Sequence, residues 1–322
     1  MNSLKEIAAE LRKPGETLLT THILPDGDSI GSLLGLGLSM REAGLPVTMH
    51  SADGVPFRYR FLRGVEHVVS GEVPDVAFAR VVTLDCSDPL RLRPVWAAVK
   101  DRLIINIDHH TTNQRFGTLN FVDPAAAATG EIIFDLLSEM GLPLKAEVAA
   151  ALFIAISTDT GSFKYENTTP RTYRLAAQLL EAGAKPQELS LPVFDLRTRA
   201  ATFILRLALE SLKFSADGRI AWMVLTEEEM ERAGAKDEDL EGIVNFAKNI
   251  ENVEIGLIFR AKKEGSVKVA FRSRNIDVSK VAEVFGGGGH PRASGCSLES
   301  DLDSAVTLIL SALQNILPRT KD

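Results

Sequence analysis

The sequence has few cysteines, no long apolar run and no excess of positive charge, and each absence excludes a class of protein. Its 2 cysteines, Cys86 and Cys296, match no metal or redox spacing and favour reduced thiols in a cytoplasmic protein over a disulfide framework. The first residues lack the apolar core of a signal peptide, and no stretch reaches the roughly 18 apolar residues of a membrane span. The net charge of −7 argues against a chain-wide electrostatic contact with nucleic acid, so we expect neither long duplex nucleic acid nor a membrane as a partner.

The remaining composition is that of an ordinary globular protein with two domains. Hydrophobic residues make up 45% and charged residues 25% of the 322 residues, which allows a large core without covalent staples. Apolar runs that alternate with helical patterns predict an N-terminal α/β domain with a parallel sheet over residues 1–185. A linker over 186–212, which includes a connecting helix, leads to a smaller mixed α/β domain over 213–322, where hairpin patterns dominate.

One short stretch organises the N-terminal domain. Residues 104–108 form an apolar run that predicts a buried strand, and this run ends in Asp108, His109 and His110. In an open α/β sheet, ligands bind at the carboxyl ends of the strands, so we expect chemistry at this point. A helix cap and an ordinary loop histidine are the alternative interpretation of any one of these residues. The chain has only 6 histidines, however, and two of them are adjacent here.

Acidic and imidazole side chains recur at the ends of other predicted elements. They are His22, Asp26 and Asp28 after a strand over 17–24, Asp85 after a strand over 76–84, and Asp159 after a helix over 147–157. Taken singly, Asp28 could be the N-cap of a helix over 29–43, Asp26 could belong to a turn, and Asp159 could be a turn residue. Those interpretations leave His22 unexplained at the same strand end.

If these carboxylates converge, their mutual repulsion is severe. Burying even one unpaired carboxylate costs several kcal/mol, and two divalent cations would neutralise four of them. Oxygen ligands with one or two imidazoles suit Mn²⁺ or Mg²⁺ better than structural Zn²⁺. Two such ions roughly 3.5–4 Å apart can share a hydroxide and act on a phosphorus centre.

A glycine run in the C-terminal domain suggests an anion site. Four consecutive glycines at 286–289 are not expected for packing, but they let backbone N–H groups approach an anion closely. A flexible loop is the alternative, although His290 and Arg292 directly after the run favour phosphate binding. The window 260–274 is rich in Lys and Arg, and a solvated hairpin face explains its lysines adequately.

Together these motifs resemble the DHH phosphoesterase superfamily. The matching pieces are His22-x3-Asp26-x-Asp28-Ser29-x-Gly31-Ser32, Leu84-Asp85, Asp108-His109-His110 and Ser157-Thr158-Asp159-Thr160-Gly161. The run Gly286-Gly287-Gly288-Gly289-His290 resembles the DHHA1 domain of that superfamily. The similarity covers nearly the whole chain in the family's order. It is greatest to the compact nanoRNase/pAp phosphatase (NrnA-like) group and to related stand-alone linear-dinucleotide phosphodiesterases.

The resemblance implies roles for individual residues. Two Mn²⁺ per chain are implied, with Mg²⁺ or Co²⁺ as substitutes: one held by His22, Asp26 and Asp85, the other by Asp28, Asp85, His109 and Asp159. Asp85 would bridge the ions, His110 would contact the scissile phosphate and serve the leaving oxygen, and Asp108 would orient a neighbouring imidazole. Substrate contacts are implied for Arg272, Ser273, Gly287, Gly288, Gly289, His290 and Arg292, with Arg272 as a phosphate clamp.

The resulting expectation is a Mn²⁺-dependent phosphodiesterase in the cytoplasm, with its active site in a cleft between the two domains. It would degrade very short RNA or linear dinucleotides to 5′ mononucleotides through a two-metal activated hydroxide, and it would also act as a 3′-phosphatase on pAp. A cyclic-dinucleotide (c-di-AMP) phosphodiesterase and a non-catalytic nucleotide-binding sensor remain as alternatives. A RecJ-type exonuclease on long polymers, a DHH inorganic pyrophosphatase and a structural α/β protein without a site are weaker alternatives. A homodimer is implied by the resemblance alone.

Overall fold

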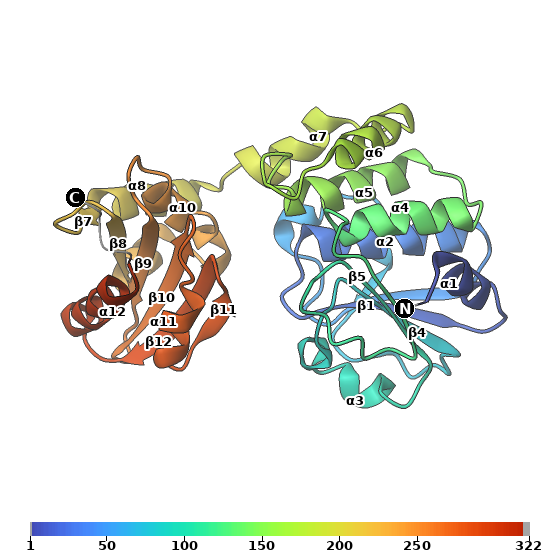
Figure 1. Cartoon of the computed structure of the whole chain (residues 1–322), viewed down its shortest axis with the longest axis horizontal. Helices are drawn as coiled ribbons and strands as arrows, with labels where there is room; N and C mark the ends of the chain where they lie inside the picture. The colour runs from blue at the N-terminus through green and yellow to red at the C-terminus, as the bar shows by residue number, and fades with distance from the viewer. Residues whose placement is uncertain (1, 318–322) are drawn as a thin grey trace. The chain divides into compact units, whose positions relative to one another are not determined.

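A computed structural model describes residues 2–317. The chain forms two compact units, of which the first ends at Leu196 and the second begins at Arg197 (Figure 1). Each unit has its own six-stranded sheet and its own core. The two units are therefore described separately.

The sheet of the first unit is parallel throughout, as predicted. Its strands are β1 (Thr17–Thr21), β2 (Val47–Ser51), β3 (Val68–Ser70), β4 (Arg80–Leu84), β5 (Ile104–Asp108) and β6 (Leu119–Val122). Every residue of β1, β4 and β5 is buried, which is why these strands are continuous runs without polar alternation. The strand order is β3-β2-β1-β4-β5-β6. The direction of winding reverses between β1 and β4, so their carboxyl ends flank a crevice of the kind that binds ligands.

Helices cover both faces of this sheet. They are α1 (Leu4–Leu11), α2 (Gly27–Glu42), α3 (Trp96–Val99), α4 (Thr129–Glu139), α5 (Ala146–Asp159), α6 (Pro170–Glu181) and α7 (Pro186–Ser190). Short 3₁₀ turns lie at Phe57–Tyr59, Val65–His67 and Pro89–Leu92, and a π turn lies at Leu191–Asp195. Helices α2, α4 and α5 lie on one side of the sheet and α3 on the other (Figure 1). The α2–α5 contact is so close that a Cβ at Gly31 would lie 2.4 Å from the backbone oxygen of Ala151.

The second unit has a mixed sheet with helices on both faces. Its strands are β7 (Lys213–Phe214), β8 (Ile220–Thr226), β9 (Ile255–Ala261), β10 (Ser266–Ser273), β11 (Gly288–His290) and β12 (Ala293–Glu299), in the order β11-β12-β10-β9-β8-β7. Its helices are α8 (Arg199–Glu210), α9 (Glu227–Ala233), α10 (Val244–Lys248), α11 (Ser279–Val284) and α12 (Leu302–Ile316), with a 3₁₀ turn at Asp237–Leu240. Among the described strands of this second unit, only the β8–β9 pairing is parallel. The predicted fold class, α/β with a parallel sheet followed by a smaller mixed domain, is confirmed.

Several boundaries differ from those predicted. The segment expected as a turn at 121–124 begins as strand β6, because its backbone completes the sheet beside β5. Residues 186–212 divide between the units. Leu189 and Val193 pack in the core of the first unit, whereas Ile204 and Leu207 pack in the second.

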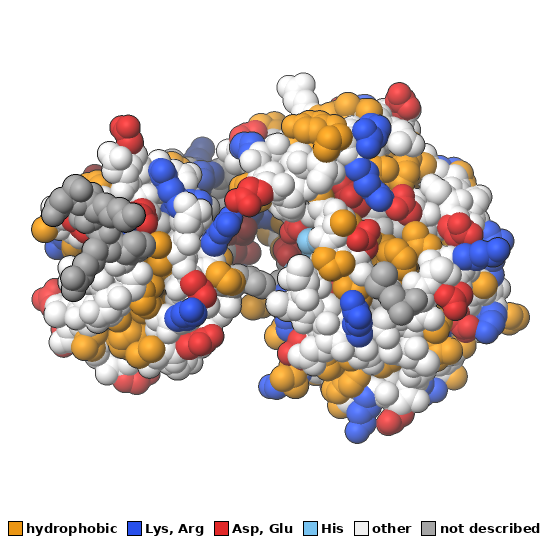
Figure 2. Space-filling model, in the orientation of Figure 1, with side chains coloured by type: hydrophobic (Ala, Val, Ile, Leu, Met, Phe, Trp, Pro, Cys, Tyr) orange, Lys and Arg blue, Asp and Glu red, His pale blue; other side chains and the backbone are white. Residues whose placement is uncertain are grey.

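The surface of both units is of mixed charge. On the face drawn in Figure 2, Lys and Arg side chains are scattered among acidic, polar and apolar ones. Within residues 2–317, no helix combines the length and the apolar character needed to cross a membrane.

Candidate metal centre

The predicted metal residues meet at one edge of the parallel sheet. His22 follows β1, Asp85 follows β4, and Asp108 ends β5 directly before the two histidines. Asp26 and Asp28 lie at the start of α2, and Asp159 is the last residue of α5. The structure therefore brings together side chains that are up to 137 positions apart, from His22 to Asp159.

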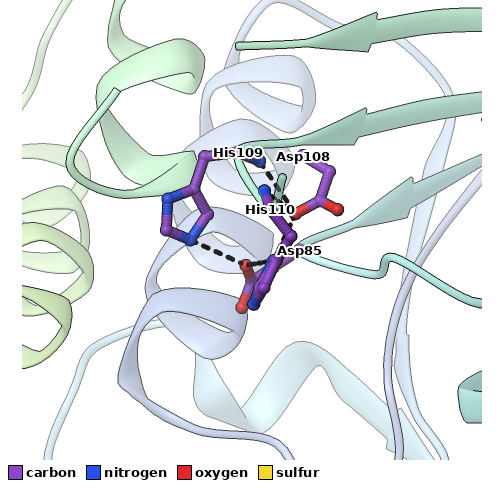
Figure 3. A group of neighbouring side chains, drawn as sticks. All are labelled: Asp85, Asp108, His109 and His110. Carbon is purple, nitrogen blue, oxygen red and sulfur yellow. Dashed lines mark hydrogen bonds and ion pairs between the residues drawn. The ribbon is translucent and has the colours of Figure 1, made fainter. Parts of the chain in front are cut away.

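Three overlapping groups have ligand atoms within 4.8 Å of one another. They are Asp85, Asp108, His109 and His110; His22, Asp26 and Asp85; and Asp28, His109 and Asp159. Figure 3 shows the first group, in which side chains from the ends of the neighbouring strands β4 and β5 converge. The two other groups correspond to the two ligand sets that the family resemblance implies. The first set is His22, Asp26 and Asp85, and the second is Asp28, His109 and Asp159 with Asp85 in addition.

Asp85 lies between these sets. Its Oδ2 is 3.5 Å from Nε2 of His22, and its Oδ1 is 3.7 Å from Nε2 of His109. Each carboxylate oxygen thus faces a different set, an arrangement in which one carboxylate can bridge two ions. The residue has a left-handed φ of 57°, an uncommon conformation for a residue other than glycine that Asp tolerates better than most. This sharp turn directs the carboxylate to the sheet edge while the backbone N–H still bonds to the oxygen of Ile107.

The N-terminus of α4 fixes the second set. The backbone N–H groups of Thr129 and Gly130 donate to the carboxylate of Asp28 at 2.6 and 2.9 Å, and the Thr129 hydroxyl donates to Asp85 at 3.1 Å. A helix N-terminus favours a negative charge, so it holds Asp28 in place without neutralising it fully. Nε2 of His109 lies 3.3 Å from Asp159 and 3.8 Å from Asp28.

The first set is tied to the start of α2. The N-cap of this helix is Asp26 and not Asp28, so the capping alternative for Asp28 is wrong. Oδ1 of Asp26 accepts from the N–H of Ser29, while its Oδ2 lies 3.9 Å from Nε2 of His22. The Nδ1 atom of His22 lies 2.7 Å from the oxygen of Ile23. Nη2 of Arg91 lies 2.9 Å from the same Nδ1, and Nε2 of His22 faces the two carboxylates.

The electrostatics of the cluster favour cations. Burial raises the pKa of Asp28 and Asp85 well above the usual value, and repulsion from neighbouring carboxylates raises both further. Burial also raises the pKa of Asp159 and lowers that of His22, which favours the neutral imidazole that binds metals. Crowded, buried oxygen ligands with neutral imidazoles fit divalent cations such as Mn²⁺ or Mg²⁺. The residues present therefore fit the predicted pair of ions.

Asp108 differs from the other carboxylates in that it holds an imidazole by a short hydrogen bond. Oδ1 accepts from Nδ1 of His110 at 2.7 Å and from the backbone N–H of His109 at 2.8 Å, and Oδ2 accepts from Asn113 at 2.5 Å. Burial opposes the charged forms, but this hydrogen bond outweighs it, so the pKa of Asp108 is lowered and that of His110 is raised. The geometry supports Asp108 as the residue that orients His110.

Comparison with known proteins identifies the family. Residues 16–156 match the DHH family, N-terminal domain, and residues 219–317 match the DHHA1 domain. The Thermus thermophilus protein named bifunctional oligoribonuclease and PAP phosphatase NrnA is 36% identical over 320 residues, covering 97% of this chain and 94% of that protein. The chain belongs to the DHH family. A Bacillus subtilis protein with the same name is 27% identical over 88% of this chain and 89% of its own length.

Solved structures agree on the fold of this DHH protein. An exopolyphosphatase-related protein from Bacteroides fragilis has a TM-score of 0.89 at 24% identity and covers 97% of this chain and 95% of its own. RecJ from Thermus thermophilus, solved in complex with Mn²⁺, has a TM-score of 0.53 at 14% identity, covering 99% of this chain and 55% of its own. At these identities the likeness shows the fold alone.

Three residues that contact the predicted metal ligands or their neighbours in the DHH domain were not predicted from the sequence. Asn113 holds Asp108, Thr129 holds Asp85, and Asn167 donates to the backbone oxygens of Ala127 and Asp159 at 2.9 and 3.1 Å. Thr129 stands at the start of a predicted helix, where an anion-binding N-terminus could have been considered. The two asparagines lie in loops whose sequence carries no periodic pattern, so only the fold reveals their contacts.

The predicted substrate residues of the DHHA1 domain lie at the β10–β12 end of its sheet. Arg272 and Gly287 line one cavity of about 680 Å³, and Gly286 lines it with them. The Ser273 hydroxyl donates to the backbone oxygen of Ile276. Gly288 and Gly289 pair with Gly295 and Ser294, and Arg292 lies in the turn before β12. The side chain of His290 is outside the described part of the structure.

The interpretation of the glycine run as unneeded for packing is wrong. A Cβ at Gly287 would lie 2.1 Å from the backbone oxygen of Gly295, and one at Gly289 would lie 2.6 Å from that of Ala293. Gly289 also has a φ of 138°, which L side chains rarely adopt. Residues 288–290 form edge strand β11. Close backbone packing therefore explains two of the four glycines.

Proposed function

We propose that this DHH protein is a phosphodiesterase that degrades very short RNA or linear dinucleotides to 5′ mononucleotides and also removes the 3′ phosphate from pAp. The observation that carries the proposal is the buried carboxylate cluster in which the two oxygens of Asp85 face two separate ligand sets. The names of the full-length relatives, oligoribonuclease and PAP phosphatase, support the substrate class. The chain is accordingly a phosphoester hydrolase.

Two divalent cations complete the proposed site. His22, Asp26 and Asp85 would hold one, and Asp28, Asp85, His109 and Asp159 the other. When bound, the pair supplies charge neutralisation for the phosphate and a water nucleophile activated at neutral pH. The mixture of carboxylates and imidazoles favours Mn²⁺, with Mg²⁺ or Co²⁺ as substitutes.

The remaining residues of the proposed site orient His110, donate a proton or bind a phosphate of the substrate. Asp108 holds the imidazole of His110 through Nδ1 and favours its protonated form. A protonated imidazole can bind the scissile phosphate and can donate a proton to the leaving oxygen. In the DHHA1 domain, Arg272 would bind a phosphate of the substrate, since guanidinium groups pair with phosphate through two hydrogen bonds.

A cytoplasmic location is also proposed, on the basis of the thiols. Cys86 and Cys296 are both free and buried. Burial raises the pKa of the Cys86 thiol to about 12 and that of Cys296 to about 11. Such thiols are unreactive and form no disulfide, as is usual for proteins of a reducing compartment.

The test is turnover on a panel of substrates with Mn²⁺, Mg²⁺ or Co²⁺. The panel contains RNA of two to five nucleotides, a long single strand, linear pApA, cyclic di-AMP, pAp and pyrophosphate. Release of mononucleotides from the shortest RNA and of phosphate from pAp is the expected result. Preference for cyclic di-AMP would replace the proposal with its first alternative. Cleavage of pyrophosphate alone, or of nothing, would overturn it, and the second outcome would favour a nucleotide sensor.

A further inference from the structure

Arg91 places a cation beside the carboxylate cluster of the DHH domain. It belongs to the 3₁₀ turn Pro89–Leu92, six residues after Asp85 in the segment that follows β4. Its Nη2 atom lies 2.9 Å from Nδ1 of His22. In the part of the chain that the structure describes, its guanidinium forms no ion pair with a carboxylate. Guanidinium groups bind carboxylates and phosphates equally well by geometry, so an unpaired one at this site suits an anionic ligand.

The backbone fixes the position of Arg91. Its carbonyl oxygen accepts from the N–H of Ile23 at 2.7 Å, and its own N–H donates to the oxygen of Asp88 at 3.0 Å. The next residue, Leu92, is fully buried. The bond to Ile23 joins the segments that follow β1 and β4, the neighbouring strands between which the direction of winding reverses. The half-buried side chain of Arg91 therefore lies at the crevice where ligands of such sheets bind.

Nδ1 of His22 cannot form hydrogen bonds to both of its neighbours at once. It lies 2.7 Å from the carbonyl oxygen of Ile23, which only accepts, and 2.9 Å from Nη2 of Arg91, which only donates. A metal ion bound at Nε2 uses the lone pair of that atom, so Nδ1 of the neutral ring then carries the proton and donates to Ile23. In that state Nδ1 has no lone pair for Arg91, and Nη2 loses its acceptor.

The charge of Arg91 also acts on His110. Burial lowers the pKa of His110, the hydrogen bond to Asp108 raises it, and the nearby charge of Arg91 opposes that rise. Nδ1 of His110 lies 3.6 Å from Oδ1 of Asp85. In the site without metal the carboxylates balance both cationic groups, but two divalent cations would neutralise four carboxylates. An anion such as a phosphate then balances Arg91 and His110.

We propose that Arg91 is a further catalytic residue of the DHH domain. With His22 coordinated through Nε2, the guanidinium of Arg91 binds a non-bridging oxygen of the scissile phosphate and stabilises the charge that develops there. Donors placed where charge develops contribute most when water is excluded, as at a half-buried crevice. The inference rests on the proposed function and adds a phosphate-binding residue to its site.

The test compares Arg91→Gln and Arg91→Lys with the wild type. Calorimetric titration of the Mn²⁺-loaded protein with inorganic phosphate should show about 10–100-fold weaker binding in Arg91→Gln, the loss expected for a hydrogen bond to a charged group. On pAp the same variant should lose at least about 100-fold in kcat/KM. Arg91→Lys keeps the charge without the planar fork, so it should recover part of both losses. Arg102→Gln removes the charge of an exposed arginine in the same unit, and this control should change neither value.

The affinity for Mn²⁺ distinguishes phosphate binding from support of His22. A Mn²⁺ titration of metal-free Arg91→Gln should give an affinity equal to or higher than that of the wild type, because a neighbouring cation opposes the binding of further cations. If Arg91 instead acts by holding His22 in place, the affinity for Mn²⁺ falls together with kcat/KM. That result would overturn the inference.

Further outcomes separate this inference from the proposed function. A wild-type protein that cleaves dinucleotides and pAp, together with an Arg91→Gln variant of unchanged phosphate affinity and kcat/KM, overturns the role of Arg91 and leaves the proposed function intact. A wild-type protein inactive on every nucleotide overturns the proposed function, whereas loss of phosphate binding in Arg91→Gln would still support Arg91 as an anion-binding residue. If Arg91→Gln melts well below the wild type, Arg91→Lys provides the comparison and should lower kcat/KM about tenfold.

Discussion

Two acidic clusters, one in each domain, have opposite surroundings. In the DHH domain, Asp28 and Asp85 are each 1% exposed and face other carboxylates and imidazoles. In the DHHA1 domain, acidic residues face cations, as Asp237 and Glu227 do around Arg260. Both domains have six-stranded sheets, so the difference does not follow from the sheets themselves.

This contrast is the one expected between a site that could hold metal ions and a surface of paired charges. Buried like charges cost free energy and persist when a cation neutralises them. Paired charges at a surface contribute little stability, but they determine which ligands are attracted or repelled. The predictions below test this difference, starting with the largest expected effect.

The largest effect is expected for Asp85→Asn in the DHH domain. Loss of the shared carboxylate should lower kcat/KM on pAp by more than about 1000-fold, beyond the 10–100-fold typical of residues that only orient ligands. In chelator-treated protein the same substitution should raise Tm by a few degrees, because one buried negative charge is removed. Turnover assays and thermal melts measure the two effects. Activity near wild type would refute the assignment of Asp85.

A smaller effect is expected when the support of His110 is removed. Asn113→Ala takes away the donor to Oδ2 of Asp108 and should lower kcat roughly 10–100-fold. Steady-state kinetics on pAp and a Mn²⁺ titration followed by calorimetry give the readouts. Asn315→Ala, on the exposed side of α12, is the control and should change neither. An equal loss in both variants would show that the effect is not specific to the site.

Substitution of Arg272, the proposed phosphate clamp of the DHHA1 domain, should change mainly KM. Arg272→Lys keeps the charge but loses the planar fork, so KM for the dinucleotide should rise about tenfold while kcat changes little. Melting temperature with and without Mn²⁺ should stay within a degree or two of the wild type. A fall in kcat at unchanged KM would place Arg272 in the chemical step instead of in substrate binding.

The smallest functional effect is expected for helix caps. Thr226→Ala removes a capping box at α9, in which the Thr226 hydroxyl accepts from the N–H of Glu229 at 3.2 Å. The cost should be roughly 0.5–2 kcal/mol of unfolding free energy with activity unchanged. Ser3→Ala removes the matching box at α1 in the DHH domain and should cost a similar amount. Denaturant unfolding checks both, and a large difference would show that the domains differ in cooperativity.

Much of the DHH domain could be predicted because its sequence and its topology agree. Strands β1, β4 and β5 are apolar runs that stop abruptly, and parallel strands place their carboxyl ends at one edge. The candidate metal residues at these strand ends therefore lie close together at that edge of the sheet. Strand β6 was missed because it is only 4 residues long, and its pairing with β5 is what orders it.

The DHHA1 domain was less predictable, since its cavity depends on pairings across strands. The glycine run suggested an anion site, but only the distances to Gly295 and Ala293 show that Gly287 and Gly289 are required for packing. A solvated hairpin face was the interpretation of the lysines of 260–274, and it assigned no partner to Arg260. The acids that balance Arg260 come from segments more than twenty positions away in sequence.

The sequence alone determined the class of fold, the family resemblance and the candidate metal ligands, because these depend on residue types at fixed spacings and at strand ends. The tertiary structure decided which atoms face one another: that Asp85 presents one oxygen to each ligand set, that Asp26 caps α2, and that Asn113 supports Asp108. Distances across loops and sheets follow from packing of the whole chain, which no local pattern encodes.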